Sequence, residues 1–283
     1  MYELGMIPVQ SVLFMCISVG IMILLPIGYI AVACILKKAS FFSGIWGILG
    51  FILSFCTYGI LWCLYVVIRS GGFVTTNLSM SYYMVYAVFA GVFSALWMAL
   101  LWKKLGKKRN RPWDSMCFYA GFALANGVKL CLPIIDNVRL TNLYNQIGII
   151  GIQGSMDETQ SRLVFEKLYQ ISMKDSSYFL INGLEALLLF MIFLAMGYLL
   201  AQIITSSKKQ TALLLLLLLI CLQIMAELPT QLLRTTKLEI DGKEIILTCV
   251  ACAAVGIDLI LIFRKRRVSG HGNSGNAEKD AAD

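Results

Sequence analysis

Seven long apolar runs constrain this chain more than any other feature of its sequence. Each has about 20 residues or more, the length that an α-helix needs to cross a bilayer. Because hydrocarbon offers the backbone no hydrogen-bond partners, such segments have to be helical. The sequence therefore predicts an all-α polytopic membrane protein, with a transmembrane domain over 1–267 and runs at 9–36, 41–68, 79–102, 115–135, 178–204, 211–233 and 244–263.

The composition supports this class. Charged residues make up 14% of the 283 residues, whereas about a quarter is normal in a soluble domain. Glu3 stands where a secretory signal has its basic segment, so we expect the first run to remain as a helix. The net charge of +8 comes from basic residues at the ends of apolar runs, without aromatic interleaving. We therefore predict the lipid bilayer as a partner and no nucleic acid.

Lysine and arginine are unevenly distributed between the two sides of the predicted bundle. Basic clusters follow the first, third, fifth and seventh runs. With Lys279 of the tail they place 15 of the 24 lysines and arginines on one side, against 8 on the other, and Lys129 lies within a run. The cytoplasmic side normally carries this excess. We therefore expect the N-terminus outside and the C-terminus in the cytoplasm, with 268–283 as a disordered cytoplasmic tail.

The longest connection between runs, 136–177, is then an outer loop. Ser155–Glu158 reads SMDE and fits a capping box. The residues after it favour an amphipathic helix lying on the outer leaflet, with one apolar face. A lid over a substrate is the alternative interpretation. The expected apolar face consists of Leu163, Val164, Leu168 and Ile171.

Cysteine and histidine usage does not indicate a metal site. All nine cysteines fall in apolar runs, and the one histidine, His271, lies in a Gly/Ser/Asn-rich tail. An odd number of membrane cysteines is not typical of a disulfide framework. We predict neither a metal nor a cofactor.

Three runs carry a pair of polar residues at helical spacing. Lys129, Glu185 and Glu227 each lie about 9 to 10 Å inside the outer edge of their runs, at 1.5 Å per residue. A lysine at such depth is costly unless it is paired or hydrated. We therefore expect Lys129 to meet both glutamates in one polar centre, which is either a structural lock or an outward-facing cavity that handles a proton or activates water. The six members are Asn126, Lys129, Asn182, Glu185, Gln223 and Glu227.

Around these residues the chain resembles the YhfC-type family of bacterial membrane proteins, which is viewed as a family of intramembrane peptidases related to the CAAX-processing, glutamic-type membrane proteases. The resemblance runs from LLPIGYIAVACILKK in the first run to the runs around Glu185 and Glu227. It implies a helical bundle in the bacterial cytoplasmic membrane and a site built from carboxylates.

Most positions of the family's motifs are substituted here. The EExxR positions of the third run hold Ser94, Ala95 and Met98. The GHGGxEA stretch keeps Gly127 but has Ala125 at the histidine and Lys129 at the glutamate. Glu185 is retained next to Ala186 in place of arginine, and the HxxxDxP element reads Gln223, Glu227 and Pro229.

These substitutions predict a membrane-embedded scaffold that binds another membrane protein or a lipid-like ligand and is catalytically degenerate. One alternative is an active intramembrane peptidase, a hydrolase in which Glu185 and Glu227 are the catalytic candidates. A further alternative is a transporter that handles a proton or a solute at the polar centre.

Overall fold

The computed structural model describes residues 6–70, 80–106, 111–153, 157–206, 208–232, 248–250, 253–254 and 256–258. The described elements are all helices. Their bounds are α1 Val9–Lys37, α2 Phe41–Ser70, α3 Met80–Gly106, α4 Pro112–Gln153, α5 Glu158–Ser172, α6 Ser176–Thr205 and α7 Lys209–Leu232.

Six of these helices are long and apolar enough to cross a membrane, namely α1, α2, α3, α4, α6 and α7. They coincide with the first six predicted runs, which confirms the prediction of an all-helical, multi-pass membrane protein. The predicted seventh span, 244–263, lies largely outside the described residues. Within it, Val250 and Ala254 are buried in the main hydrophobic core.

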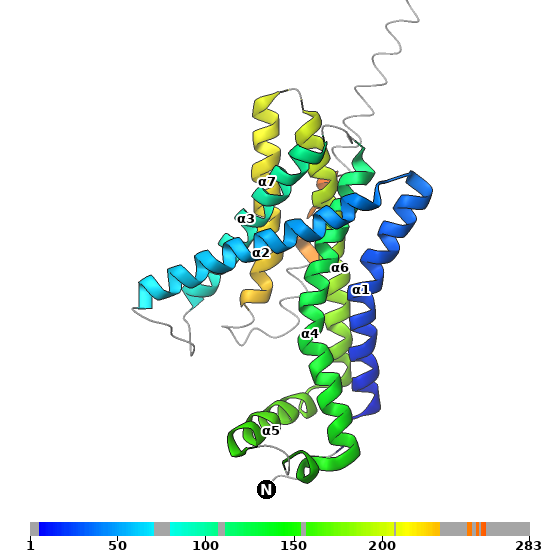
Figure 1. Cartoon of the computed structure of the whole chain (residues 1–283), viewed down its shortest axis with the longest axis vertical. Coiled ribbons are helices and arrows are strands. Elements are labelled where there is room, and N and C mark those ends of the chain that lie inside the picture. The colour runs from blue at the N-terminus through cyan, green and yellow to red at the C-terminus, as the bar shows by residue number, and fades with distance from the viewer. Residues whose placement is uncertain are drawn as a thin grey trace, which may run out of the picture.

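Helix α4 is the centre of the arrangement, because it packs against α1, α2, α5 and α6. Figure 1 shows α1, α4 and α6 side by side along the long axis, with α2 lying across them. Helix α3 pairs with α7 and also contacts α2. Helix α5 lies at one end of the bundle, and the α1–α2 and α6–α7 turns lie at the other end (Figure 1).

Glycine allows α2 to cross α4 at very short range. A Cβ added at Gly47 of α2 would overlap the carbonyl oxygen of Phe118, and one at Gly121 of α4 would overlap the carbonyl oxygen of Gly44. Small residues at crossings of this kind let two backbones touch, which favours helix association inside a membrane. The crossing is therefore a contact between backbones rather than between side chains.

Helix α4 extends beyond the predicted end of the fourth run at residue 135. It continues to Gln153, across a break at Gly148, where φ is 70°. The prediction that 136–153 belongs to a loop was wrong, because a drop in hydropathy marks where a helix leaves an apolar layer and not where the helix ends. Val138 and Tyr144 explain the extension, since both pack into a hydrophobic cluster with α1, α5 and α6.

Helix α5 forms where an amphipathic helix was expected, but two details differ. Its N-cap is Asp157, whose carboxylate accepts a hydrogen bond of 2.7 Å from the Gln160 N–H; Ser155 lies outside the described residues. Leu168 and Ile171 are buried and Val164 packs beside them, whereas Leu163 is 62% exposed. The apolar face of α5 is therefore narrower than predicted, and it packs on protein.

Candidate functional site

The six predicted polar residues lie on α4, α6 and α7, and the structure distributes them over several environments. Asn126 and Glu185 are each 8% exposed, and Gln223 is completely buried. Lys129, Asn182 and Glu227 are partly exposed. That they act as one functional centre remains a prediction.

Lys129 lies against helix α2. Its Nζ is 5.2 Å from the centroid of the Phe55 ring, a distance at which the ring's negative face attracts a cation. Within the described part of the chain, Lys129 forms no ion pair of 4 Å or less with Glu185 or Glu227, since Arg162–Glu166 is the pair found there. The expected direct pairing of Lys129 with the glutamates is therefore not seen.

Phe55 belongs to a series of aromatic contacts between α2 and α3. The Tyr58 ring contacts Phe55 at a centroid distance of 5.6 Å and Tyr86 of α3 at 5.4 Å. Glu227 lies on α7 and is partly exposed, next to Ala226, which is buried in the main hydrophobic core.

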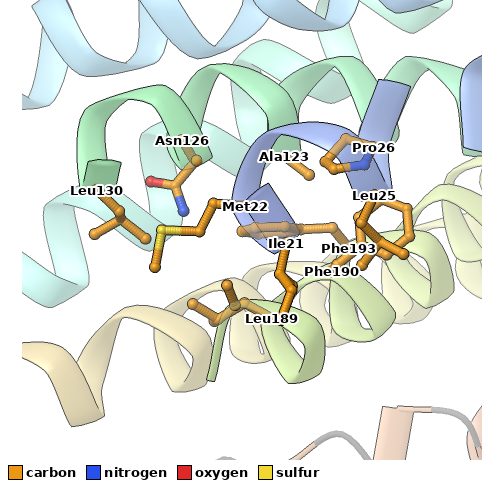
Figure 2. Close-up of a pocket in the computed structure, with 12 residues that line it drawn as sticks. Ile21, Met22, Leu25, Pro26, Ala123, Asn126, Leu130, Leu189, Phe190 and Phe193 are labelled. Carbon is orange, nitrogen blue, oxygen red and sulfur yellow. The ribbon is translucent and has the colours of Figure 1, made fainter. Parts of the chain in front are cut away.

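Asn126 faces a small cavity between α1, α4 and α6 (Figure 2). The cavity has a volume of about 20 Å³, which is room for one water-sized molecule. Pro26 of α1 removes the N–H that would bond the Met22 carbonyl. That carbonyl faces Gly127, where an added Cβ would lie 2.5 Å from its oxygen. The polar side chain that lines this otherwise apolar cavity is that of Asn126.

Gln223 is buried on α7, one residue before Ile224, which packs on Gly91 of α3. Neither its Oε1 nor its Nε2 has a hydrogen-bond partner among the described residues. Glu185 is buried on α6, next to Ala186, which lines the cavity around Asn126. The two side chains lie on different helices, α7 and α6.

Asn182 belongs to a larger cavity, which we call the α5 pocket. It has a volume of about 260 Å³ and lies between α4, α5 and the start of α6. The Asn182 amide donates a 3.5 Å hydrogen bond to the Tyr178 carbonyl. The pocket is lined by Pro133, Ile134, Asn137, Lys167, Gln170, Ile171, Lys174, Tyr178, Phe179 and Asn182.

The α5 pocket contains residues that the sequence analysis did not single out. Lys167 and Gln170 are three residues apart on one side of α5, and Lys174 follows two residues after the end of this helix at Ser172. Asn137 follows Pro133 by one turn, on the part of α4 that was expected to be a loop. The two lysines, close together in the sequence, were the available signal.

The described residues contain no group of three or more His, Cys, Asp or Glu side chains that could hold a metal ion. His271 lies outside them. No protein-family model matches the chain, and no curated protein or solved structure matches it either. The role of the α5 pocket is therefore inferred from its own geometry.

Proposed function

We propose that this chain is a binding protein of the bacterial inner membrane, which takes a lipid-like ligand in the α5 pocket and does not cleave peptides. The observation that carries the proposal is a pocket of about 260 Å³. Half of its lining residues are polar or charged, and the other half are apolar or aromatic. That volume is close to the lower end of small-ligand sites, about 300 Å³. Ile134, Ile171 and Phe179 suit an acyl chain, while the amides and lysines suit a headgroup.

The dispersion of the polar residues supports binding over catalysis. A peptidase needs a base, donors for the oxyanion and a substrate position that all lie within about 3 Å of one another. Lys129 instead lies over Phe55, and Asn182 lines the α5 pocket. On a YhfC-like scaffold, with the family's catalytic positions substituted, the α5 pocket has room for a ligand and offers it both polar and apolar side chains.

The charge distribution supports an orientation for this pocket. The basic residues Lys37, Lys38, Lys208 and Lys209 flank the turns at the end of the bundle away from α5. Cytoplasmic ends carry such residues. With this orientation, the α5 pocket opens to the outer leaflet.

Lipid retention tests the proposal. The full-length protein is purified in a mild detergent, and retained lipids are counted by native mass spectrometry. Asn182→Trp fills the α5 pocket, and Leu184→Trp is the matched control, because Leu184 lies two residues away and is 48% exposed. We expect lipid on wild type and the control, and little on Asn182→Trp. Equal retention by all three contradicts the proposal.

A second measurement does not depend on the folding of a variant. A photoactivatable lipid is crosslinked to the wild-type protein in membranes, and the labelled peptides are identified. We expect labels on 133–137, 167–174 and 178–182. Labelling confined to other helices contradicts binding in the α5 pocket.

Peptidase activity is tested separately, by comparing new peptide termini in membranes that contain wild type, Glu185→Gln or Glu227→Gln at matched levels. We expect the three samples to show the same termini. Products that appear with wild type alone would make this chain an enzyme and would contradict the non-catalytic proposal.

A further inference from the structure

We propose that the α5 pocket selects a lipid with an anionic phosphate headgroup, such as phosphatidylglycerol, over a zwitterionic lipid. The inference rests on the proposed function, because it names the ligand of the same pocket. Two observations carry it: the charge of the wall and the position of an aromatic ring.

The charged side chains that line the α5 pocket are both lysines, Lys167 and Lys174. Neither forms an ion pair with a carboxylate in the part of the chain that the structure describes. The nearby carboxylates are engaged elsewhere: Glu166 accepts a hydrogen bond from Arg162 at 3.1 Å, and Asp175 accepts one from Ser177 at 3.0 Å. Both lysines are exposed. Two positive charges at one cavity, neither of them matched by a carboxylate, favour a phosphate, for which lysine is a common ligand.

The two lysines also disfavour a zwitterionic headgroup. Its ammonium would be repelled by them, whereas the glycerol of phosphatidylglycerol is neutral.

Tyr178 indicates that the pocket lies where the membrane meets water. The Nζ of Lys174 lies 3.9 Å from the centroid of the Tyr178 ring, which holds the ammonium at the start of α6. Tyrosine is enriched where a membrane meets water. The apolar residues Ile134 and Phe179 line the same cavity, so the geometry points to a phosphate that is attached to acyl chains and not to a free phosphate ion.

The test uses the full-length protein in nanodiscs of phosphatidylcholine, to which phosphatidylglycerol is added as a minor component. Bound lipid is measured by native mass spectrometry. The variant carries Lys167→Gln and Lys174→Gln, and the matched control carries Lys208→Gln and Lys209→Gln at the opposite end of the bundle. Lysines near a membrane surface contribute about fivefold each to the binding of an anionic lipid. We therefore expect the pocket variant to lose about 25-fold in preference for phosphatidylglycerol, and the control to keep it.

Two results would overturn the assignment of an anionic lipid. If phosphatidylcholine binds as well as phosphatidylglycerol, charge does not select the ligand, although the proposed function stands. If soluble glycerol phosphate binds without lipid and displaces phosphatidylglycerol, the ligand is a free phosphate ester. Absence of any bound lipid contradicts the proposed function itself, so the two failures are distinguishable.

Discussion

The ammonium group of Lys129 lies 5.2 Å from the ring centroid of Phe55 on the neighbouring helix α2. This contact takes the place in which the sequence suggested a carboxylate. A cation over an aromatic face is stabilised without a second charge, so no carboxylate has to enter the contact. Removal of Lys129 is therefore expected to remove a contact between a cation and an aromatic ring, rather than an ion pair.

Lys129 and Phe55 should be energetically coupled. In a double-mutant cycle with Lys129→Met and Phe55→Leu, we expect a coupling of about 0.5 to 1 kcal/mol, typical of a partly exposed cation and ring. Thermal unfolding in detergent measures the four stabilities. The cycle of Lys129→Met with Glu185→Gln is the comparison, and a larger coupling there would contradict the contact with Phe55.

The crossing of α2 and α4 should not tolerate a methyl group. Gly47→Ala places a Cβ on the Phe118 carbonyl, and we expect a loss of at least about 1 to 3 kcal/mol, as for other overpacked sites. Gly59→Ala, on the same helix, meets nothing within 4 Å and should be neutral or slightly stabilising. Equal melting temperatures of the two variants would contradict the backbone contact.

The start of α5 should depend on Asp157. Asp157→Ala removes the acceptor for the Gln160 N–H, and we expect α5 to lose about 1 kcal/mol of stability. Hydrogen exchange of the α5 amides measures the loss. Asp157→Asn keeps an acceptor and should behave like wild type. Asp175→Ala is a second control, because Asp175 makes no side-chain cap bond at the start of α6. Faster exchange in the controls than in Asp157→Ala would contradict the assignment.

Asn145 should hold the residues that precede α1. Its side chain accepts a hydrogen bond from the Ile7 N–H at 3.2 Å and donates one to the Ile7 carbonyl at 3.0 Å. Asn145→Ala leaves both backbone groups without partners, which costs about 1 to 3 kcal/mol. Exchange at the Ile7 amide should accelerate in this variant. It should remain slow in Asn142→Ala, a change at an exposed residue one turn earlier on α4.

The helical class and six of the membrane helices could be predicted from the sequence, because apolar length alone decides both. The extension of α4 to Gln153 could not, since it depends on packing by residues such as Tyr144 that are distant from the bilayer run. The exposure of Leu163 was missed for a related reason. Periodicity places a residue on a face, but the width of the buried stripe depends on what packs against it.

The candidate site was only partly accessible to sequence reasoning. Depth along a run indicates which residues share a layer, but it does not indicate the rotation of each helix. Asn126 and Lys129 illustrate this, because they are three residues apart and yet contact different helices. Asn137 and Lys167 lie in elements that the hydropathy pattern could not join, so the α5 pocket emerges from the tertiary arrangement.

The backbone contact at Gly47 and Gly121 also limits how α2 can move. Side chains close the contact one turn further along α2: the Phe51 ring lies 5.3 Å from that of Phe122, and a Cβ at Gly50 would lie 2.7 Å from the Met98 sulfur. The glycines and these side chains together hold α2 at one place on α4. The crossing therefore fixes the point at which Phe55, one further turn along α2, meets the ammonium group of Lys129.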